Sequence, residues 1–237
     1  MSLRKLFSLC ALVALCAFFL TPQPAVSAAE GPTLMSGGPL TFGPDNVLFI
    51  ADNTGAKIVA LELGDRVSSG TSGTKDVPGI DQKIAALLGT DAREIQINDL
   101  AVSPTSKNAF ISVSRGRGAN ATPVLLRVDG AGTIEVISLG AVAYTTAELP
   151  NAPDANPEAR RNPRASSITD MAYVDGQLFI AGLSNEEFSS KLRSVAYPFS
   201  TVNEGTSVEI WHAAHGAFET RSPVYTFVPY KIGGEQN

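Results

Sequence analysis

The two histidines of the chain lie three residues apart, in the segment Trp211-His-Ala-Ala-His-Gly216. Imidazole nitrogens are ligands for zinc and copper, and Glu209 or Glu219 could add a carboxylate oxygen. Residues three apart on a regular strand point to opposite faces, so His212 and His215 can share an ion only where a bulge or turn separates them. Gly216 is compatible with such a turn. The segment therefore offers a metal site, or else two ordinary histidines at the end of a strand.

Two aspartates, Asp99 and Asp170, occupy the same place in two similar segments, one residue before the apolar run of an expected strand. Carboxylates at matching places in repeated units could converge on a cation such as calcium. The alternative is that each carboxylate accepts backbone hydrogen bonds in the turn that leads into its strand. Three further aspartates are predicted as simple turn residues: Asp45, Asp52 and Asp175.

Arg115 and Arg117 form a short basic segment, Arg115-Gly-Arg-Gly118, that could hold an anion or lie in a solvated turn. The sequence contains no Ser nucleophile elbow, phosphate-binding loop or paired-carboxylate hydrolase signature. Its 23 acidic residues outnumber the 18 basic ones. Nucleic acid is therefore a poor candidate partner.

Residues 1–28 have the composition of a secretory signal peptide. Arg4 and Lys5 precede an apolar run at residues 6–20, and small residues and prolines follow. The apolar run is short for a membrane span. Cys10 and Cys16 would leave with this leader, so neither a disulfide nor a thiolate metal site is expected in the mature chain. We predict a secreted or periplasmic protein with no membrane span after cleavage.

Three segments repeat one pattern, in which a strand-like run, a turn rich in Pro, Gly or Asp, and a second strand-like run follow one another. They cover residues 39–51, 99–112 and 170–181. A third run follows each pair (57–63, 123–128 and 191–197), and a fourth follows two of them (133–139 and 207–213). Four short antiparallel strands in each unit are typical of a β-propeller blade. We predict an all-β propeller with units at about 37–96, 97–166 and 167–222, and one helical segment at 81–88.

The segment Tyr225-Thr-Phe-Val-Pro229 matches Leu40-Thr-Phe-Gly-Pro44, so a fourth unit is expected at residues 223–237. Propellers need about four to eight blades to close. Three blades and the first strand of a fourth predict that the chain is the N-terminal part of a longer propeller. The alternative is that the last strand completes the first blade and closes a small propeller.

Two segments resemble known propeller repeats. Residues 48–60, Leu-Phe-Ile-Ala-Asp-Asn-Thr-Gly-Ala-Lys-Ile-Val-Ala, resemble the NHL repeat, and residues 97–104, Ile-Asn-Asp-Leu-Ala-Val-Ser-Pro, are similar to a strand of the gluconolactonase-like propellers. The second resemblance implies a divalent cation held at the channel mouth by a Glu, an Asn and an Asp. Asn98 occupies the Asn place, but Gly37 stands where the Glu is expected and Thr169 where the Asp is expected. The resemblance therefore implies the fold while two of three cation ligands are replaced.

These observations predict an exported propeller protein that binds a small molecule or a protein partner on a loop face and catalyses no reaction. One alternative is a metal-dependent hydrolase or lactonase of the gluconolactonase-like type. A second is a metal or redox accessory protein that uses His212 and His215. A cofactor, where one is bound, would be calcium, zinc or copper. The candidate ligand-binding residues are Asn98, Asp99, Asp170, Arg115 and Arg117.

Overall fold

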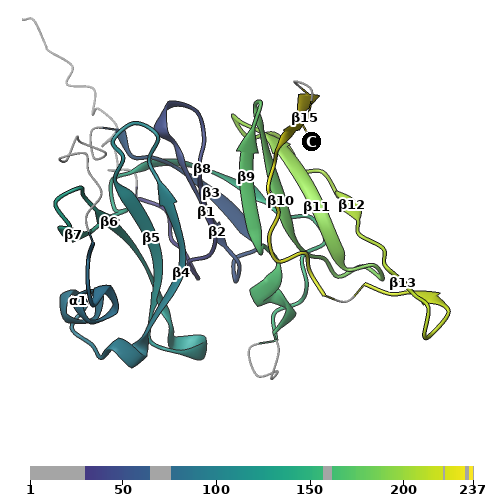
Figure 1. Cartoon of the computed structure of the whole chain (residues 1–237), viewed down its shortest axis with the longest axis horizontal. Helices are drawn as coiled ribbons and strands as arrows, with labels where there is room; N and C mark the ends of the chain where they lie inside the picture. Colours follow the sequence, from purple (N-terminus) through teal and green to yellow (C-terminus); the bar gives the residue numbers. More distant parts are fainter. Residues whose placement is uncertain (1–29, 65–75, 157–161, 221, 233–234, 237) are drawn as a thin grey trace, which may run out of the picture.

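Three four-stranded antiparallel sheets, stacked face to face, dominate the computed structural model (Figure 1). The structure describes residues 30–64, 76–156, 162–220, 222–232 and 235–236, so the predicted signal peptide lies outside it. Strands make up most of the regular structure of these residues, which confirms the predicted all-β class. Within the same ranges, no helix is both long enough and apolar enough to cross a membrane.

Each sheet pairs its strands in a simple antiparallel order. The first sheet contains β1 (Leu40–Phe42), β2 (Leu48–Asp52), β3 (Lys57–Glu62) and β8 (Ala143–Glu148). The second contains β4 (Ile95–Val102), β5 (Ala109–Arg115), β6 (Thr122–Val128) and β7 (Ile134–Val136). The third contains β9 (Asp170–Val174), β10 (Gln177–Leu183), β11 (Ser190–Ala196) and β12 (Thr206–Ser207). Two hairpins follow, β13 (Trp211–His212) with β14 (Ala217–Phe218), and β15 (Lys231–Ile232) with β16 (Glu235–Gln236).

In the part of the chain that the structure describes, helical structure is confined to short segments. The helix α1 (Ile80–Leu87) confirms the predicted helical segment at 81–88. Within the described residues, four 3-10 turns lie at Pro44–Asn46, Ala92–Glu94, Gly118–Asn120 and Pro163–Ser166. α1 packs Ile84 and Ala85 against the outer face of the second sheet and so covers part of it.

The fourth strand of the first sheet comes from a distant part of the chain. β8 follows the whole second sheet in sequence, yet it pairs with β3 so that Ala147 lies opposite Ile58. The sequence predicts no fourth strand for the unit at 37–96, and the sheet takes this strand from residues beyond that unit. β3 is buried and its outer edge needs hydrogen-bond partners, which β8 provides. Ala147 is the only buried residue of β8, so an apolar pattern does not mark this strand in the sequence.

The first sheet lies at the centre of the stack, between the second sheet and the third (Figure 1). On β2, Leu48 and Ile50 pack toward the second sheet, while Phe49 and Ala51 pack toward the third. Both faces of β2 are buried, so its sequence is a continuous apolar run up to Asp52. β1 contacts both β4 and β9, so the first strands of the three sheets lie together.

An aromatic cluster fills the space between the first and third sheets. The ring of Phe49 lies 5.8 Å from that of Tyr173, 5.1 Å from Tyr197 and 5.7 Å from Phe199, measured between ring centroids. Gly43 closes one side of the cluster, since a Cβ atom there would lie 2.3 Å from Cε2 of Phe49. The position therefore requires glycine because of this close approach.

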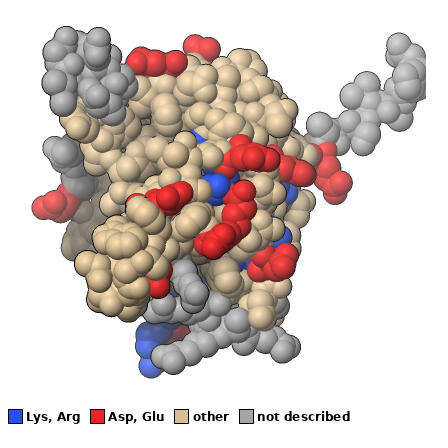
Figure 2. Space-filling model, turned by 90° about the vertical axis from the view of Figure 1, so that its right-hand side faces the viewer, with Lys and Arg blue, Asp and Glu red and all other residues tan. Residues whose placement is uncertain are grey.

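The end of the chain differs from the predicted pattern. The strand expected at 207–213 is interrupted, since β12 ends at Ser207 and Trp211 pairs with Phe218 in a separate hairpin. The segment at 223–230 is not a strand of the first sheet. It lies against the third sheet, where the backbone N–H of Val224 donates to Oγ of Ser190 at 3.2 Å. Figure 2 shows the molecule from the side that carries the third sheet, and on this face acidic side chains outnumber basic ones.

Candidate functional site

A hollow of about 480 Å³ lies where the chain enters the first strands of the three sheets. We call it the inner hollow. All of its lining residues are uncharged, and most carry a hydroxyl or amide group. They are Ser36, Gly37, Gly38, Pro39, Asn53, Thr54, Gln96, Ile97, Asn98, Ala165, Ser166, Ile168, Thr169 and Tyr225. The surface of the inner hollow is therefore suited to hydrogen bonding with a neutral molecule.

Asn98 reaches the inner hollow because β4 contains a bulge. The pairing of β4 with β5 shifts between Ile97 and Asp99, so Asn98 is the extra residue of the strand. Its Nδ2 donates to the carbonyl oxygen of Gly37 at 2.8 Å and to Oγ of Ser114 at 2.9 Å. Asn98 thus ties β4 to the segment that leads into β1.

The three positions that the gluconolactonase-like resemblance aligns all line the inner hollow. They are Gly37, Asn98 and Thr169. A side chain at position 37 would place its Cβ 2.8 Å from Oγ of Ser112, so a glutamate does not fit there without a shift. The hydroxyl of Thr169 donates to the carbonyl oxygen of Val224. The fold brings the three places together, but none of them carries a carboxylate, and Gly37 and Thr169 stand where the resemblance implies one.

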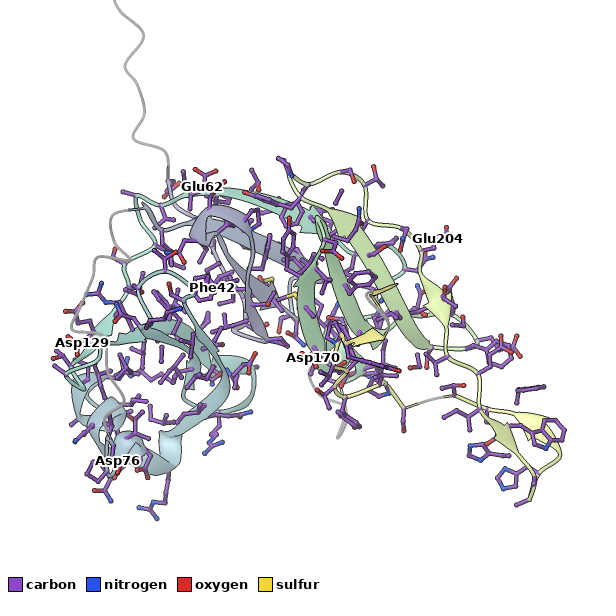
Figure 3. All side chains as sticks on the ribbon, turned by 45° about the horizontal axis from the view of Figure 1, so that its top comes forward. Phe42, Glu62, Asp76, Asp129, Asp170 and Glu204 are labelled. Atoms are coloured by element: carbon purple, nitrogen blue, oxygen red, sulfur yellow. The ribbon has the colours of Figure 1, made fainter. Side chains whose placement is uncertain are left out.

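Asp99 and Asp170 act as hydrogen-bond acceptors between neighbouring parts of the chain. Oδ2 of Asp99 accepts the backbone N–H of Leu40 at 2.7 Å, and Oδ2 of Asp170 accepts that of Phe227 at 3.0 Å. Asp170 also accepts the N–H of Met171 at 2.8 Å. Figure 3 shows Asp170 at the centre of the molecule, at the inner edge of the third sheet. Neither aspartate lines the inner hollow, and both carboxylates contact backbone N–H groups.

The pKa of Asp99 reflects this environment. Burial raises the pKa above its ordinary value of 3.8, and the backbone N–H groups of Leu40 and Leu100 oppose the shift. The negative charge of Asp170 adds to the increase. The two carboxylates are therefore close enough to repel each other, which raises the cost of ionising Asp99.

Of the three aspartates predicted as turn residues, Asp45 and Asp175 lie in turns, whereas Asp52 is the last residue of β2 and has a larger structural role. Asp45 and Asp175 adopt left-handed backbone conformations, with φ of 50° and 47°. Asp52 is fully buried and accepts the backbone N–H groups of Met35 and Ser36, both at 2.9 Å. It also accepts the N–H of Gly55 at 3.0 Å, as a turn residue would. Asp52 therefore anchors the segment that enters β1.

The two arginines lie away from the inner hollow. Arg115 is the exposed last residue of β5. Arg117 donates from Nε to the carbonyl oxygen of Arg93 at 3.0 Å and from Nη2 to that of Ile95 at 3.4 Å. Neither residue lines the inner hollow, so the structure does not bring them together with Asn98. Arg117 instead links its turn to the start of β4.

A second depression of about 900 Å³, the outer groove, lies beside the inner hollow. The two share Ala165, Ser166 and Tyr225. The outer groove also includes the carboxylates of Asp154 and Glu186, and sequence reasoning missed it as a site. The Pro- and Asn-rich stretch after β8 was the available signal, because long insertions between strands often carry binding residues.

The two histidines lie on the hairpin formed by β13 and β14. Nδ1 of His215 lies 3.2 Å from Oε1 of Glu219, and Nδ1 of His212 lies 3.9 Å from Oε2 of the same residue. Among the described residues, His212, His215 and Glu219 form the one group of three donors close enough to hold a metal ion. The structure thus brings the histidine pair together with Glu219.

No protein-family model matches the chain. Neither its sequence nor its fold has a significant match among curated proteins or solved structures. The resemblance to NHL-repeat and gluconolactonase-like propellers therefore rests on the residues quoted above and on the places that the fold gives them. Of those places, Gly37, Asn98 and Thr169 share the inner hollow.

Proposed function

We propose that the chain is an exported binding protein, built from propeller-type blades, that holds a small uncharged ligand in the inner hollow and catalyses no reaction. Three four-stranded antiparallel sheets with adjacent first strands support the blade assignment. The resemblance to NHL-repeat and gluconolactonase-like propellers is consistent with it. The composition of residues 1–28 supports export.

The observation that carries the proposal is the chemistry of the inner hollow. Side-chain hydroxyl and amide groups, such as those of Thr54, Gln96 and Ser166, can both donate and accept hydrogen bonds there. Its volume lies in the range of small-molecule sites. Tyr225 stands at the rim with 70% of its surface exposed, so its ring is available to stack on a ligand. A neutral molecule rich in hydroxyl groups, such as a saccharide, fits this combination.

The absence of catalysis is proposed because nearby carboxylates already have structural partners. Asp52, Asp99 and Asp170 each accept backbone N–H groups. Hydrolysis assisted by a cation would need several oxygen ligands at the mouth of the hollow. Gly37 and Thr169 stand where two of those ligands would be required.

A binding titration tests the proposal. We expect one or more members of a panel of neutral mono- and disaccharides to bind, measured by isothermal titration calorimetry. Gln96→Ala and Tyr225→Ala should each weaken that binding by about fivefold or more, since each removes a contact worth about 1 kcal/mol or more. Gln82→Ala on α1 and Tyr230→Ala are matched controls outside the hollow and should leave it unchanged. Two outcomes would count against the proposed ligand class. One is that the two control variants weaken binding as much as the two variants in the hollow, and the other is that no saccharide binds.

A hydrolysis assay separates this proposal from the lactonase alternative. The protein is mixed with glucono-δ-lactone in the presence of calcium or zinc, and the release of acid is followed. We expect no rate above that of the buffer. Hydrolysis that requires the cation and is lost in Asn98→Ala would overturn the proposal and favour the enzyme.

A further inference from the structure

We propose that the β13–β14 hairpin binds one divalent zinc or copper ion through Nδ1 of His212, Nδ1 of His215 and the carboxylate of Glu219. This site is separate from the inner hollow and does not depend on the proposed saccharide binding. It lies on a hairpin that projects from the end of the molecule that carries the third sheet (Figures 1 and 3).

The turn of the hairpin brings the two histidines to one side. Four residues, 213–216, connect the short strands. The backbone N–H groups of His215 and Gly216 both donate to the carbonyl oxygen of His212, at 3.1 Å and 2.9 Å. Gly216 adopts a φ of 63°, in the left-handed region where glycine has no steric penalty. The chain therefore turns back over residues 213–216, and His215 avoids the opposite face that a regular strand would give it.

The opposite face of the hairpin holds the turn in place. Trp211 pairs with Phe218 across the two strands, and their rings lie 5.1 Å apart in an edge-to-face arrangement. Residues next to this pair point to the other face, so His212 and Glu219 share that face. The N–H of Glu219 donates to the carbonyl oxygen of Ile210 at 2.9 Å, which extends the pairing beyond β14. The aromatic pair thus supports a fixed scaffold for the donors.

The distances between donor atoms suit a single ion. One ligand atom from each of the three residues lies within 4.8 Å of the other two. Nδ1 of His215 is 3.2 Å from Oε1 of Glu219, and Nδ1 of His212 is 3.9 Å from Oε2 of the same carboxylate. Ligand atoms about 2.0 to 2.1 Å from a tetrahedral zinc ion are about 3.3 Å apart. Only a small inward movement is therefore needed. Two imidazole nitrogens and one carboxylate oxygen favour zinc or copper over calcium or magnesium, which prefer oxygen ligands.

Exposure and charge favour access of the ion. The side chains of His212, His215 and Glu219 retain 45%, 61% and 44% of their exposure, so an ion reaches them without an opening step. Three protein donors leave coordination positions for water or another molecule. Acidic side chains outnumber basic ones at this end of the molecule (Figure 2). Their field raises the local concentration of cations.

The single tryptophan of the chain provides a direct readout. Trp211 adjoins His212, so bound Cu²⁺ should quench its fluorescence. We expect Cu²⁺ and Zn²⁺ each to bind the full chain with one ion per chain, measured by fluorescence for Cu²⁺ and by calorimetry for Zn²⁺. Calcium should not compete. His212→Gln, His215→Gln and Glu219→Gln should each weaken binding by about tenfold or more.

Glu209→Gln is the matched control, because Glu209 is an exposed acid near the hairpin outside the donor group. It should leave the affinity unchanged, and both cysteines are retained in every variant so that thiol binding is common to all. In the absence of metal, the three variants of the donor residues should melt at the same temperature as the wild type, since the replaced side chains are exposed. Unchanged affinity in the double variant His212→Gln/His215→Gln would overturn the proposal. Equal binding of calcium would also overturn it.

Discussion

The carboxylate of Asp99 on β4 accepts the backbone N–H of Leu40 on β1 at 2.7 Å and so joins the second sheet to the first. Asp170 repeats this relationship, because it accepts the N–H of Phe227 in the segment beside the third sheet. Two aspartates at matching places in the repeats thus hold the neighbouring chain segment through one backbone group each. Their role is in assembling the sheets, and the first prediction follows from the environment of Asp99.

Replacing Asp99 by Asn should change the pH dependence of stability. Burial raises the pKa of Asp99 in the folded protein above 3.8, so the folded state holds this proton more tightly than the unfolded chain. The contribution of Asp99 to stability therefore falls as the pH rises from 3.8 through the pKa of the folded state. The free energy of unfolding of the wild type, minus that of Asp99→Asn, should decrease between about pH 3.5 and pH 7. Urea unfolding of both proteins measures this difference.

Asp129→Asn is a control for which the difference in free energy of unfolding should change with pH in the opposite direction. The backbone N–H of Thr133 lowers the pKa of Asp129. The contribution of Asp129 to stability is present above its pKa in the unfolded chain. This contribution is lost as the pH falls through its pKa in the folded state. The corresponding difference for Asp129 should therefore increase with pH. A flat difference for Asp99, or one that follows Asp129, would contradict our account of its burial.

Gly43→Ala should destabilise the protein through Phe49. The added Cβ would lie 2.3 Å from the ring of Phe49, so the aromatic cluster must shift at a cost of about 1 to 3 kcal/mol. Phe49→Ala alone should cost about 3 to 5 kcal/mol. In the Phe49→Ala background the effect of Gly43→Ala should largely disappear, which a double-mutant cycle measures. Gly140→Ala is the control, because its nearest neighbour would be 3.8 Å away. Strict additivity of the two changes would show that the contact does not matter.

Ala147→Asp should lower the free energy of unfolding by about 3 kcal/mol, because it places a carboxylate in the core between the first and third sheets. Ala143→Asp makes the same change at the exposed start of β8 and should have an effect within about 0.5 kcal/mol. Urea unfolding compares the two. Similar values for both variants would argue against β8 as the fourth strand of the first sheet.

Arg193→Met should leave the stability unchanged or raise it by about 1 kcal/mol. Arg193 is 1% exposed, burial lowers its pKa, and within the described part of the chain its Nε and Nη1 have no hydrogen-bond partner. Methionine fills similar space without a buried charge. Arg127→Met breaks an ion pair with Glu135 at 2.7 Å and should instead cost up to about 1 kcal/mol. Thermal and urea unfolding measure the stability of both variants. A larger loss of stability in Arg193→Met than in Arg127→Met would mean that the charge of Arg193 stabilises the fold.

Strands with a buried face could be predicted from the sequence because burial leaves an apolar pattern. β2 is an example, since its residues up to Asp52 are apolar and buried. β8 could not be predicted in this way, because only Ala147 of that strand is buried. Its place depends on the free edge of β3, which is a property of the assembled sheet.

The candidate sites, like the strands, could be predicted from the sequence only in part. The clustering of His212 and His215 is visible in the sequence, and Gly216 indicated the turn between them. The choice of Glu219 over Glu209 depends on how the hairpin pairs, which the sequence alone does not specify. Asp99 was singled out, but its partner Leu40 is far away in the chain and is defined only by the packing of two sheets.

The late position of β8 affects how the chain folds while it is being synthesised. As the chain emerges, β1 to β3 come first, and the whole second sheet must follow before β8 can pair with β3. The edge of β3 therefore stays unpaired during that interval and is open to pairing with another chain. Closing so long a connection is slow compared with forming local hairpins. Nascent chains that stop between β7 and β8 should be the species most prone to aggregate.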